Sequence, residues 1–332
     1  MAFFANSPGL TGIIAPGEIC CVLFTFMLWQ KLQEECVKDF EYRTPTSVDE
    51  AVGLLKQYGE RARVLAGGTD LIVQLRVGRF DLDVVIDGKQ IPALNQMTFN
   101  AQDGLTIGAA VPCYRLYEDE AIAAHYPGII DSATIIGGIQ IQSRASIGGN
   151  LCNASPSGDS IPSLIAQQAV ALVTGPNGSR EVPVEQFCTA PGRTVLQPGE
   201  LLTAIRLPAP KPHSGAHYLR FIPRYEMDIA IVGAGASVVL SNDLSTITEA
   251  RVSLGAVAPT PLFVPEAGAA IAGKPATGET LALAAEAARD AARPISDMRG
   301  TIEQRKHLSA VLTTRALQGA IARAKGEHVN AH

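Results

Sequence analysis

Apolar and polar residues follow two different periods after residue 40, and the two periods take turns along the chain. A capping box, SVDE at 47–50, opens an amphipathic helix that stops at Gly59. The mostly apolar segments 62–66 and 84–86 have the length of strands, and the segment 71–77 between them has a helical pattern. The first part of the chain therefore predicts a unit in which strands and helices alternate.

The alternation continues toward the carboxyl end, with one clear break. We expect strands at 105–110, 169–174, 180–184, 201–207, 229–240 and 247–254. We expect one helix in the polar stretch that ends at residue 125, one at 161–166, and two more that start at Thr277 and at Thr301. The turn 175–178 joins two of these strands as a hairpin. Thr301 and Gln304 form a second capping box. The proline-rich piece 208–212 is the best candidate for a domain boundary.

Composition narrows the class of protein. The chain has 332 residues, is 47% hydrophobic and carries a formal net charge of -5. It has enough apolar residues for two or three folded units, and no basic face for binding nucleic acid. The six cysteines show no CxxC spacing, so we expect a reducing, cytoplasmic compartment and no metal site in this chain.

Residues 1–36 differ from the rest of the chain. The run 19–29 consists of apolar residues and cysteines apart from Thr25, but its eleven residues fall short of the roughly 20 that span a bilayer. No Lys or Arg precedes this run, and Lys31, Glu34 and Glu35 follow it where a signal peptide would have its cleavage site. We interpret 1–36 as a non-native or disordered extension, with a membrane tether as the alternative, and expect no membrane span.

Three glycine pairs interrupt the pattern at 67–68, 137–138 and 148–149. Glycine at the turn between a strand and a helix lets successive N–H groups point into one concavity, which binds phosphate oxygens. Two such loops facing each other would hold a pyrophosphate, and Gly148→Val would then fill one of them. A nucleotide is therefore indicated, although neither a P-loop nor a GxGxxG motif is present. The alternative for any single pair is a tight, closely packed turn.

Six motifs in order resemble one known family. VLAGGTDL (64–71) and ASIGGNLCNASPSGDSIP (145–162) look like the two FAD-binding signatures in the flavoprotein subunits of molybdenum hydroxylases, the group that includes the xanthine and carbon monoxide dehydrogenases. Further matches are PGELLTAIRLP (198–208), RFIPRYEMDIAIVGAG (220–235), LGAVAPTP (254–261) and RGTIEQRKHL (299–308). The resemblance covers essentially residues 40–324.

The resemblance implies an α+β fold with two main parts. An FAD-binding domain of the vanillyl-alcohol oxidase or PCMH type, built from two α/β subdomains, would occupy 37–212. A carbon monoxide dehydrogenase flavoprotein-type α+β domain would occupy 213–326, followed by the tail 327–332. FAD is the implied cofactor.

The resemblance also assigns cofactor residues one by one. The pyrophosphate loops are Ala66, Gly67, Gly68, Thr69, Asp70 and Leu71, and Ser146, Ile147, Gly148, Gly149 and Asn150. Ile136 and Leu202 match apolar contacts of the flavin. Asp159 matches a carboxylate that hydrogen-bonds FAD, and Arg220 falls where some relatives carry a Lys near the isoalloxazine.

Several of these residues have simpler interpretations that stay open. Asp159 could be a turn residue that begins a helix, and Asp70 could cap the helix after it. Arg224, Glu226 and Asp228 could form a solvated, salt-bridged turn. His213 and His217 are interpreted as surface residues, and Cys152 as a small buried apolar filler.

No nucleophile and base pair stands out, so a bound flavin would carry the chemistry. The resemblance implies that this subunit takes electrons from the [2Fe-2S] clusters of a small subunit, which receives them from a large molybdopterin-binding subunit. An external acceptor, such as NAD, oxygen or a quinone, would then receive them, in a heterotrimer that dimerises. The alternatives are a stand-alone flavin oxidase or reductase of the same fold, and a non-catalytic assembly module.

Overall fold

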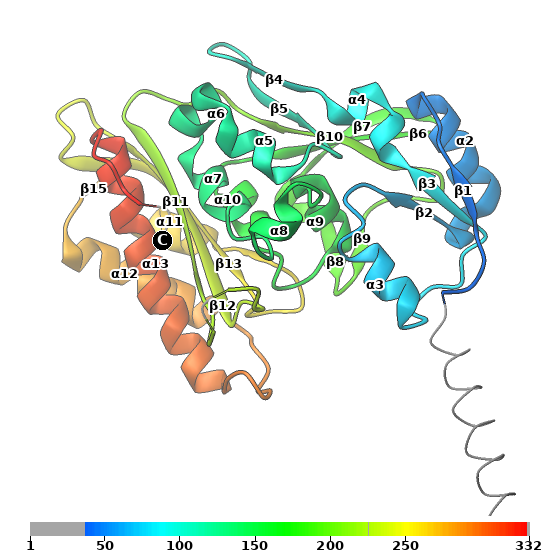
Figure 1. Cartoon of the computed structure of the whole chain (residues 1–332). Helices are drawn as coiled ribbons and strands as arrows, with labels where there is room; N and C mark the ends of the chain where they lie inside the picture. Colours follow the sequence, from blue (N-terminus) through cyan, green and yellow to red (C-terminus); the bar gives the residue numbers. More distant parts are fainter. Residues whose placement is uncertain (1–36, 225, 331–332) are drawn as a thin grey trace, which may run out of the picture.

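The computed structural model describes residues 37–224 and 226–330, and three larger sheets lie one after another along the chain (Figure 1). The expectations about segment 1–36 and about the last two residues of the tail fall outside the described residues. Within the described ranges, no helix is long and apolar enough to cross a membrane.

The first sheet is parallel, with strand order β1-β3-β2. Its elements are β1 (Glu41–Arg43), α2 (Val48–Tyr58), β2 (Ala62–Leu65), α3 (Leu71–Arg76) and β3 (Val84–Asp87). Helix α2 begins as predicted, because Ser47 Oγ accepts the N–H of Glu50. The Glu50 carboxylate reaches back one residue further than in a standard capping box, to the N–H of Thr46. The predicted alternation of strands and helices is confirmed here.

The second sheet is antiparallel, with strand order β4-β5-β10-β6-β7. Its strands are β4 (Met97–Asn100), β5 (Gly104–Gly108), β6 (Val170–Gly175), β7 (Gly178–Pro183) and β10 (Leu201–Leu207), and the predicted hairpin is formed by β6 and β7. A small hairpin, formed by β8 (Cys188–Ala190) and β9 (Arg193–Thr194), comes between β7 and β10 in the sequence.

Seven short helices belong to this part of the chain. They are α4 (Pro92–Asn95), α5 (Cys113–Glu118), α6 (Glu120–His125), α7 (Pro127–Ala133), α8 (Ile139–Gln142), α9 (Ile147–Asn153) and α10 (Ser160–Ala166). The polar stretch that was predicted as one helix is two, α5 and α6. The break occurs at Asp119, whose side chain accepts the N–H groups of Ala121 and Ile122 and so begins a new helix.

The third sheet is antiparallel, with strand order β11-β12-β13-β14 and β15 paired to β13. Its elements are β11 (Ser214–Phe221), β12 (Val232–Leu240), β13 (Thr246–Gly255), β14 (Leu262–Phe263), α11 (Pro265–Ile271), β15 (Lys274–Pro275), α12 (Gly278–Ala291) and α13 (Ile302–Ala324). Helices α12 and α13 begin with Thr277 and Thr301 as their N-caps, as predicted.

One predicted strand in this region begins later than expected, and one observed strand was missed. Strand β12 begins at Val232 rather than at residue 229, because the chain before it turns where Arg224 pairs with Asp228. Strand β11 was not predicted at all. Three successive residues of β11, 216–218, are buried, so the strand lacks the polar and apolar alternation that marks a half-buried strand.

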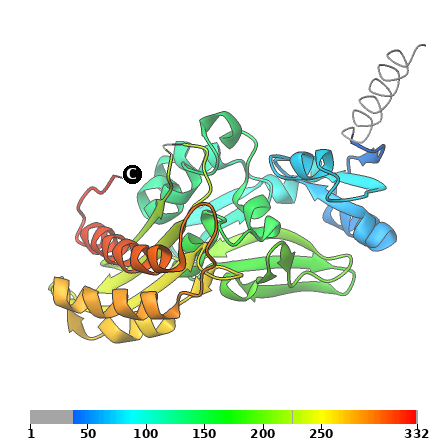
Figure 2. The ribbon, with the colours of Figure 1, turned by 90° about the horizontal axis from the view of Figure 1, so that it is seen from below.

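Each side of the third sheet is covered. Helix α13 packs on β11 and β12 from outside, with α12 beside it, and α7 and α10 pack on the inner side (Figures 1 and 2). One hydrophobic core lies within residues 51–207 and a second within 231–324. We call the contact of α7 and α10 with β11, β12 and β13 the junction. The proline-rich piece 208–212 lies between β10 and β11.

The junction is polar as well as apolar. Side chains of the third sheet donate hydrogen bonds to carbonyl groups of α10. Ser253 Oγ donates to the Pro162 carbonyl at 2.5 Å, and Ser237 Oγ donates to the Ala166 carbonyl at 2.6 Å. Arg251 donates to the Ile165 carbonyl and also pairs with Glu185. Helix α10 is thus held against the third sheet by side chains of β12 and β13.

Candidate cofactor site

The two glycine loops predicted to hold a pyrophosphate lie against each other. Loop 66–70 connects β2 to α3, and loop 146–150 begins α9. A Cβ added to Gly67 would lie 2.3 Å from the Arg144 carbonyl oxygen, and one added to Gly149 would lie 3.9 Å from Ala66 Cβ. The close approach at Gly67 requires glycine, because no side chain fits between these two backbones.

Loop 66–70 offers backbone donors at this contact. Gly68 has φ +80°, a left-handed conformation that glycine adopts without strain. Among residues 37–224 and 226–330, no protein acceptor takes up the N–H groups of Gly67, Gly68 and Thr69. Successive N–H groups of this kind suit phosphate oxygens. The bare backbone here therefore fits the pyrophosphate of a dinucleotide such as FAD.

Arg144 was missed by the sequence reasoning. It directly precedes the second motif, and its Nε donates to the Gly67 carbonyl at 3.3 Å, so its guanidinium lies beside both loops. A guanidinium in this position would favour a phosphate group. The only signal in the sequence was its place just before the motif.

Two details of the loops differ from expectation. Asp70 occupies the N-cap position of α3, but its side chain makes no capping hydrogen bond, so the capping interpretation is wrong. Gly148 is required by packing, since a Cβ there would lie 2.4 Å from the Ala109 carbonyl oxygen. Gly148→Val would therefore push α9 away from Ala109 rather than fill a phosphate site. Gly149 is the more open position, where a Cβ would approach only Ser146 Oγ closely, at 3.0 Å.

Asn150 and Ser146 connect this loop to the next part of the site. Ser146 Oγ accepts the N–H of Gly149 at 3.0 Å and so caps α9. Asn150 Oδ1 accepts from Ser160 Oγ at 2.7 Å. Ser160 is the first residue of α10, and Asp159 directly precedes it. The hydrogen bond therefore places Asp159 next to the end of the glycine loop.

Asp159 occupies the N-cap position of α10, where a turn residue that begins this helix would lie, but its side chain makes no capping hydrogen bond. Its carboxylate instead accepts from two residues of β11, Arg220 Nη1 at 2.7 Å and the Tyr218 hydroxyl at 3.0 Å. Burial raises the pKa of Asp159 to about 6, although the charge of Arg220 and the hydrogen bonds from Tyr218 and Arg220 lower it. The structure thus brings together Asp159 and Arg220, both predicted, with Tyr218, which was not.

Tyr218 could have been found from the sequence if β11 had been predicted. Residues two apart in a strand project from the same face, so Tyr218 and Arg220 would share a face. Burial raises the pKa of the Tyr218 hydroxyl well above its usual value, and the neighbouring Asp159 charge adds to the shift. The hydroxyl therefore stays protonated and serves as a donor.

Ile136 and Leu202 are both buried. Ile136 is 7% exposed and precedes Gly137, which has φ +61°. Leu202 is 2% exposed and belongs to the first hydrophobic core. Their predicted contacts with the flavin stay predictions.

Three remaining expectations have clear outcomes. His217 is not a surface residue, because it is 4% exposed and its Nδ1 lies 2.7 Å from Asp131 Oδ2. Cys152 is exposed and so is not a buried filler. Arg224 and Asp228 form an ion pair at 2.9 Å, which confirms a salt-bridged turn at these two residues.

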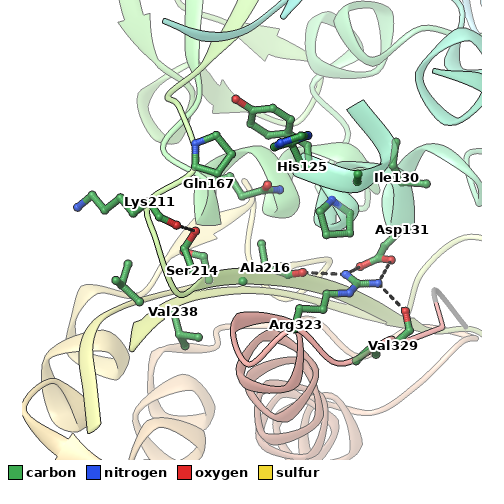
Figure 3. A pocket seen from close by; sticks show the side chains of 18 of the residues that line it. His125, Ile130, Asp131, Gln167, Lys211, Ser214, Ala216, Val238, Arg323 and Val329 are labelled. Carbon is green, nitrogen blue, oxygen red and sulfur yellow. Dashed lines mark hydrogen bonds and ion pairs between the residues drawn. The ribbon is translucent and has the colours of Figure 1, made fainter. Parts of the chain in front are cut away.

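A separate cavity of about 680 Å³ lies on another part of the junction (Figure 3). Helices α6 and α7, strand β11 and the segment 326–330 line it, and the ion pair of Asp131 with Arg323 forms part of its wall. Arg323 also donates to the Ala216 and Val329 carbonyl groups. None of the predicted cofactor residues lines this cavity. Within the described part of the chain, no group of three His, Cys, Asp or Glu side chains is placed to hold a metal ion.

The fold and the paired loops define an FAD-binding flavoprotein with a second α+β part, and comparisons with known proteins agree. Residues 38–210 match the family model of the FAD binding domain in molybdopterin dehydrogenase, and residues 217–320 match that of the CO dehydrogenase flavoprotein C-terminal domain. The chain belongs to the family of FAD-binding subunits of molybdenum hydroxylases.

Individual relatives are similar over most of their length. The xanthine dehydrogenase FAD-binding subunit of Escherichia coli O157:H7 is 31% identical over 287 residues, which is 86% of this chain and 97% of that protein. The carbon monoxide dehydrogenase medium chain of Afipia carboxidovorans is 35% identical over 291 residues, 86% of this chain and 98% of that one.

Solved structures give the same result. A chain of the reconstituted CO dehydrogenase from Oligotropha carboxidovorans superposes with a TM-score of 0.82 at 32% identity, covering 87% of this chain and 99% of that chain. Quinoline 2-oxidoreductase from Pseudomonas putida 86 superposes with a TM-score of 0.80 at 25% identity, with the same coverage. The expected α+β fold is confirmed.

Proposed function

We propose that this chain is the electron-transfer subunit of a molybdopterin-dependent dehydrogenase and holds FAD across the site described above. One observation carries the proposal. The two touching glycine loops, with N–H donors at Gly67, Gly68 and Thr69, lead through Asn150 and Ser160 directly to the buried pair of Asp159 and Arg220. An elongated dinucleotide needs donors for its central pyrophosphate and, further along, an enclosed region for one of its two ends.

Each part of the site has its own task in this proposal. The loops 66–71 and 146–150 hold the pyrophosphate, and Ile136 and Leu202 lie against the flavin. Asp159 and Arg220 set the charge around the isoalloxazine, because a cation there stabilises the reduced, anionic flavin. FAD, when bound, supplies the ability to accept single electrons and release them in pairs.

The partners follow from the same proposal. Relatives named medium chain or FAD-binding subunit are parts of multi-subunit enzymes. We infer a large molybdopterin-binding subunit, a small [2Fe-2S] subunit that delivers the electrons, an external acceptor, and a heterotrimer that dimerises. The cytoplasmic location expected from the cysteine pattern also stays a prediction. Genes for the two partner subunits next to this one would support the assembly, and their absence would favour a stand-alone flavin enzyme.

The site itself is tested by a matched pair of variants in the assembled complex. A side chain at Gly149 enters the space beside Ala66, whereas Gly53 on α2 has no atom within 4 Å of an added Cβ. We expect Gly149→Val to bind FAD at least 10-fold more weakly, and Gly53→Val to keep one FAD per chain. Flavin absorbance after gel filtration measures both. A Gly149→Val complex with full FAD content would refute the loop assignment, and a wild-type complex without FAD would refute the proposed function.

A further inference from the structure

Tyr218 is held at both of its ends by carboxylates from across the junction. Its hydroxyl donates to Asp159 Oδ1, and its backbone N–H donates to Asp131 Oδ2, each at 3.0 Å. The residue is 1% exposed. Asp131 lies on α7 and Asp159 immediately precedes α10. Tyr218 therefore connects two separate helices of the first core to β11.

The neighbouring strand leaves room for this arrangement. A Cβ added to Gly233 on β12 would lie 2.6 Å from the Tyr218 hydroxyl oxygen. Glycine at this position thus lets the hydroxyl reach Asp159. The acceptor of the Tyr218 backbone N–H, Asp131, is itself held by His217 and by Arg323 of α13, which both bond to its carboxylate. The backbone of Tyr218 is consequently set independently of its hydroxyl.

We propose that Tyr218 is a positioning residue of the flavin site, which fixes and polarises Asp159 so that Asp159 remains paired with Arg220. The inference rests on the proposed function, because it assumes that Asp159 and Arg220 act on a bound flavin. Each oxygen of the Asp159 carboxylate accepts from one donor of β11, Oδ1 from Tyr218 and Oδ2 from Arg220. Removal of the hydroxyl leaves Oδ1 without this donor while the backbone stays anchored at Asp131.

If Tyr218 has this role, its hydroxyl determines the pH at which the charge beside the flavin changes. A hydrogen bond donated to a carboxylate favours its ionised form. Without the Tyr218 hydroxyl, Asp159 takes up a proton at higher pH, and the charge of Arg220 is then no longer neutralised by it. The other charged residues nearby, Arg224 and Asp228, form an ion pair with each other, and the Asp228 carbonyl lies 3.5 Å from Arg220 Nη1.

The test is the midpoint potential of the bound flavin as a function of pH in the assembled complex. Because burial raises the pKa of Asp159 to about 6, we expect the wild-type curve to change slope near that pH. In Tyr218→Phe the change of slope should occur at a pH that is higher by about half a unit to one unit, because this shift corresponds to the free energy of one hydrogen bond. Gly233→Ala, which displaces the hydroxyl without removing it, should move the curve in the same direction.

Tyr126→Phe is the matched control. Tyr126 is also buried, at 3% exposure, and its hydroxyl donates to the Pro208 carbonyl rather than to Asp159. We expect its curve to match the wild type. A Tyr218→Phe complex that keeps FAD and the wild-type curve would overturn the inference, as would an equal shift in Tyr126→Phe.

Asp159→Asn separates this inference from the proposed function. It removes the titrating group, so the change of slope should disappear. If the change of slope persists in Asp159→Asn, then Asp159 does not act on the flavin and its assignment to the site fails. If it disappears in Asp159→Asn but does not move in Tyr218→Phe, only the role of Tyr218 fails.

Discussion

Arg220 Nη1 donates to Asp159 Oδ2 at 2.7 Å, although the two residues are 61 positions apart and belong to opposite sides of the junction. Both side chains are largely buried, at 7% and 11% exposure. A buried charge without its partner is strongly destabilising, so the pair couples the packing of the junction to the electrostatics of the proposed flavin site.

The stability of the protein should depend on pH through Asp159. Burial raises the pKa of Asp159 from 3.8 to about 6 in the folded state. Between these values the folded chain keeps a proton that the unfolded chain has released, so this contribution to stability falls as pH rises from about 4 to about 6. We compare the free energy of unfolding of the wild type with that of Asp159→Asn, which cannot titrate at this position. The stability of the wild type relative to this variant should fall by on the order of 2 to 3 kcal/mol across this interval. Urea unfolding at several pH values measures it, and parallel curves for the two proteins would contradict the raised pKa.

Asp131 should be the most sensitive position of the junction. Its carboxylate accepts from His217, from the N–H of Tyr218 and twice from Arg323. Asp131→Ala leaves Arg323 buried without a counter-charge, which should cost about 3 to 5 kcal/mol in the free energy of unfolding. Asp290→Ala is the control, because Asp290 is 77% exposed, and it should stay within about 0.5 kcal/mol of wild type. Equal urea midpoints for the two variants would argue against a structural role for Asp131.

Two glycine-to-alanine substitutions should have opposite effects. Gly53 is exposed within α2, and an added Cβ meets nothing within 4 Å. Gly53→Ala should therefore stabilise the protein by about 0.5 to 1 kcal/mol, because Ala loses less backbone entropy on folding. Gly148→Ala places a Cβ 2.4 Å from the Ala109 carbonyl oxygen, and such overpacking should cost about 1 to 3 kcal/mol. Thermal unfolding ranks the two, and a stable Gly148→Ala protein would show that α9 is free to shift.

The cap of the last helix gives a fourth prediction. Thr301 Oγ1 accepts the N–H of Gln304 at 3.2 Å, and Thr301→Ala should cost about 1 kcal/mol of stability. Thr314→Ala, inside the same helix, should be close to neutral or slightly stabilising, since Ala is the better helix former. Both are measured by urea unfolding. A larger loss at Thr314 than at Thr301 would show that packing rather than capping determines this helix.

Local features of the sequence predicted much of the fold correctly. Ser47, Thr277 and Thr301 begin their helices as expected, because a capping hydrogen bond spans only three residues. The hairpin of β6 and β7 was also predicted, from its turn residues. Strand β11 was missed because both of its faces are covered, by α7 on one side and α13 on the other. A strand buried on both faces has no local pattern that distinguishes its sides.

The sequence by itself determined the family, the cofactor class and the two glycine loops, since these depend on short motifs whose order is preserved in the chain. Only the tertiary structure decided which residues meet. It placed Arg144 beside Gly67, assigned Gly148 to packing, moved His217 from the surface to Asp131, and joined Asp159 to Tyr218 and Arg220. The reason is physical: the partners of a buried charge or a closely packed glycine come from distant segments, and their positions depend on how whole sheets and helices pack.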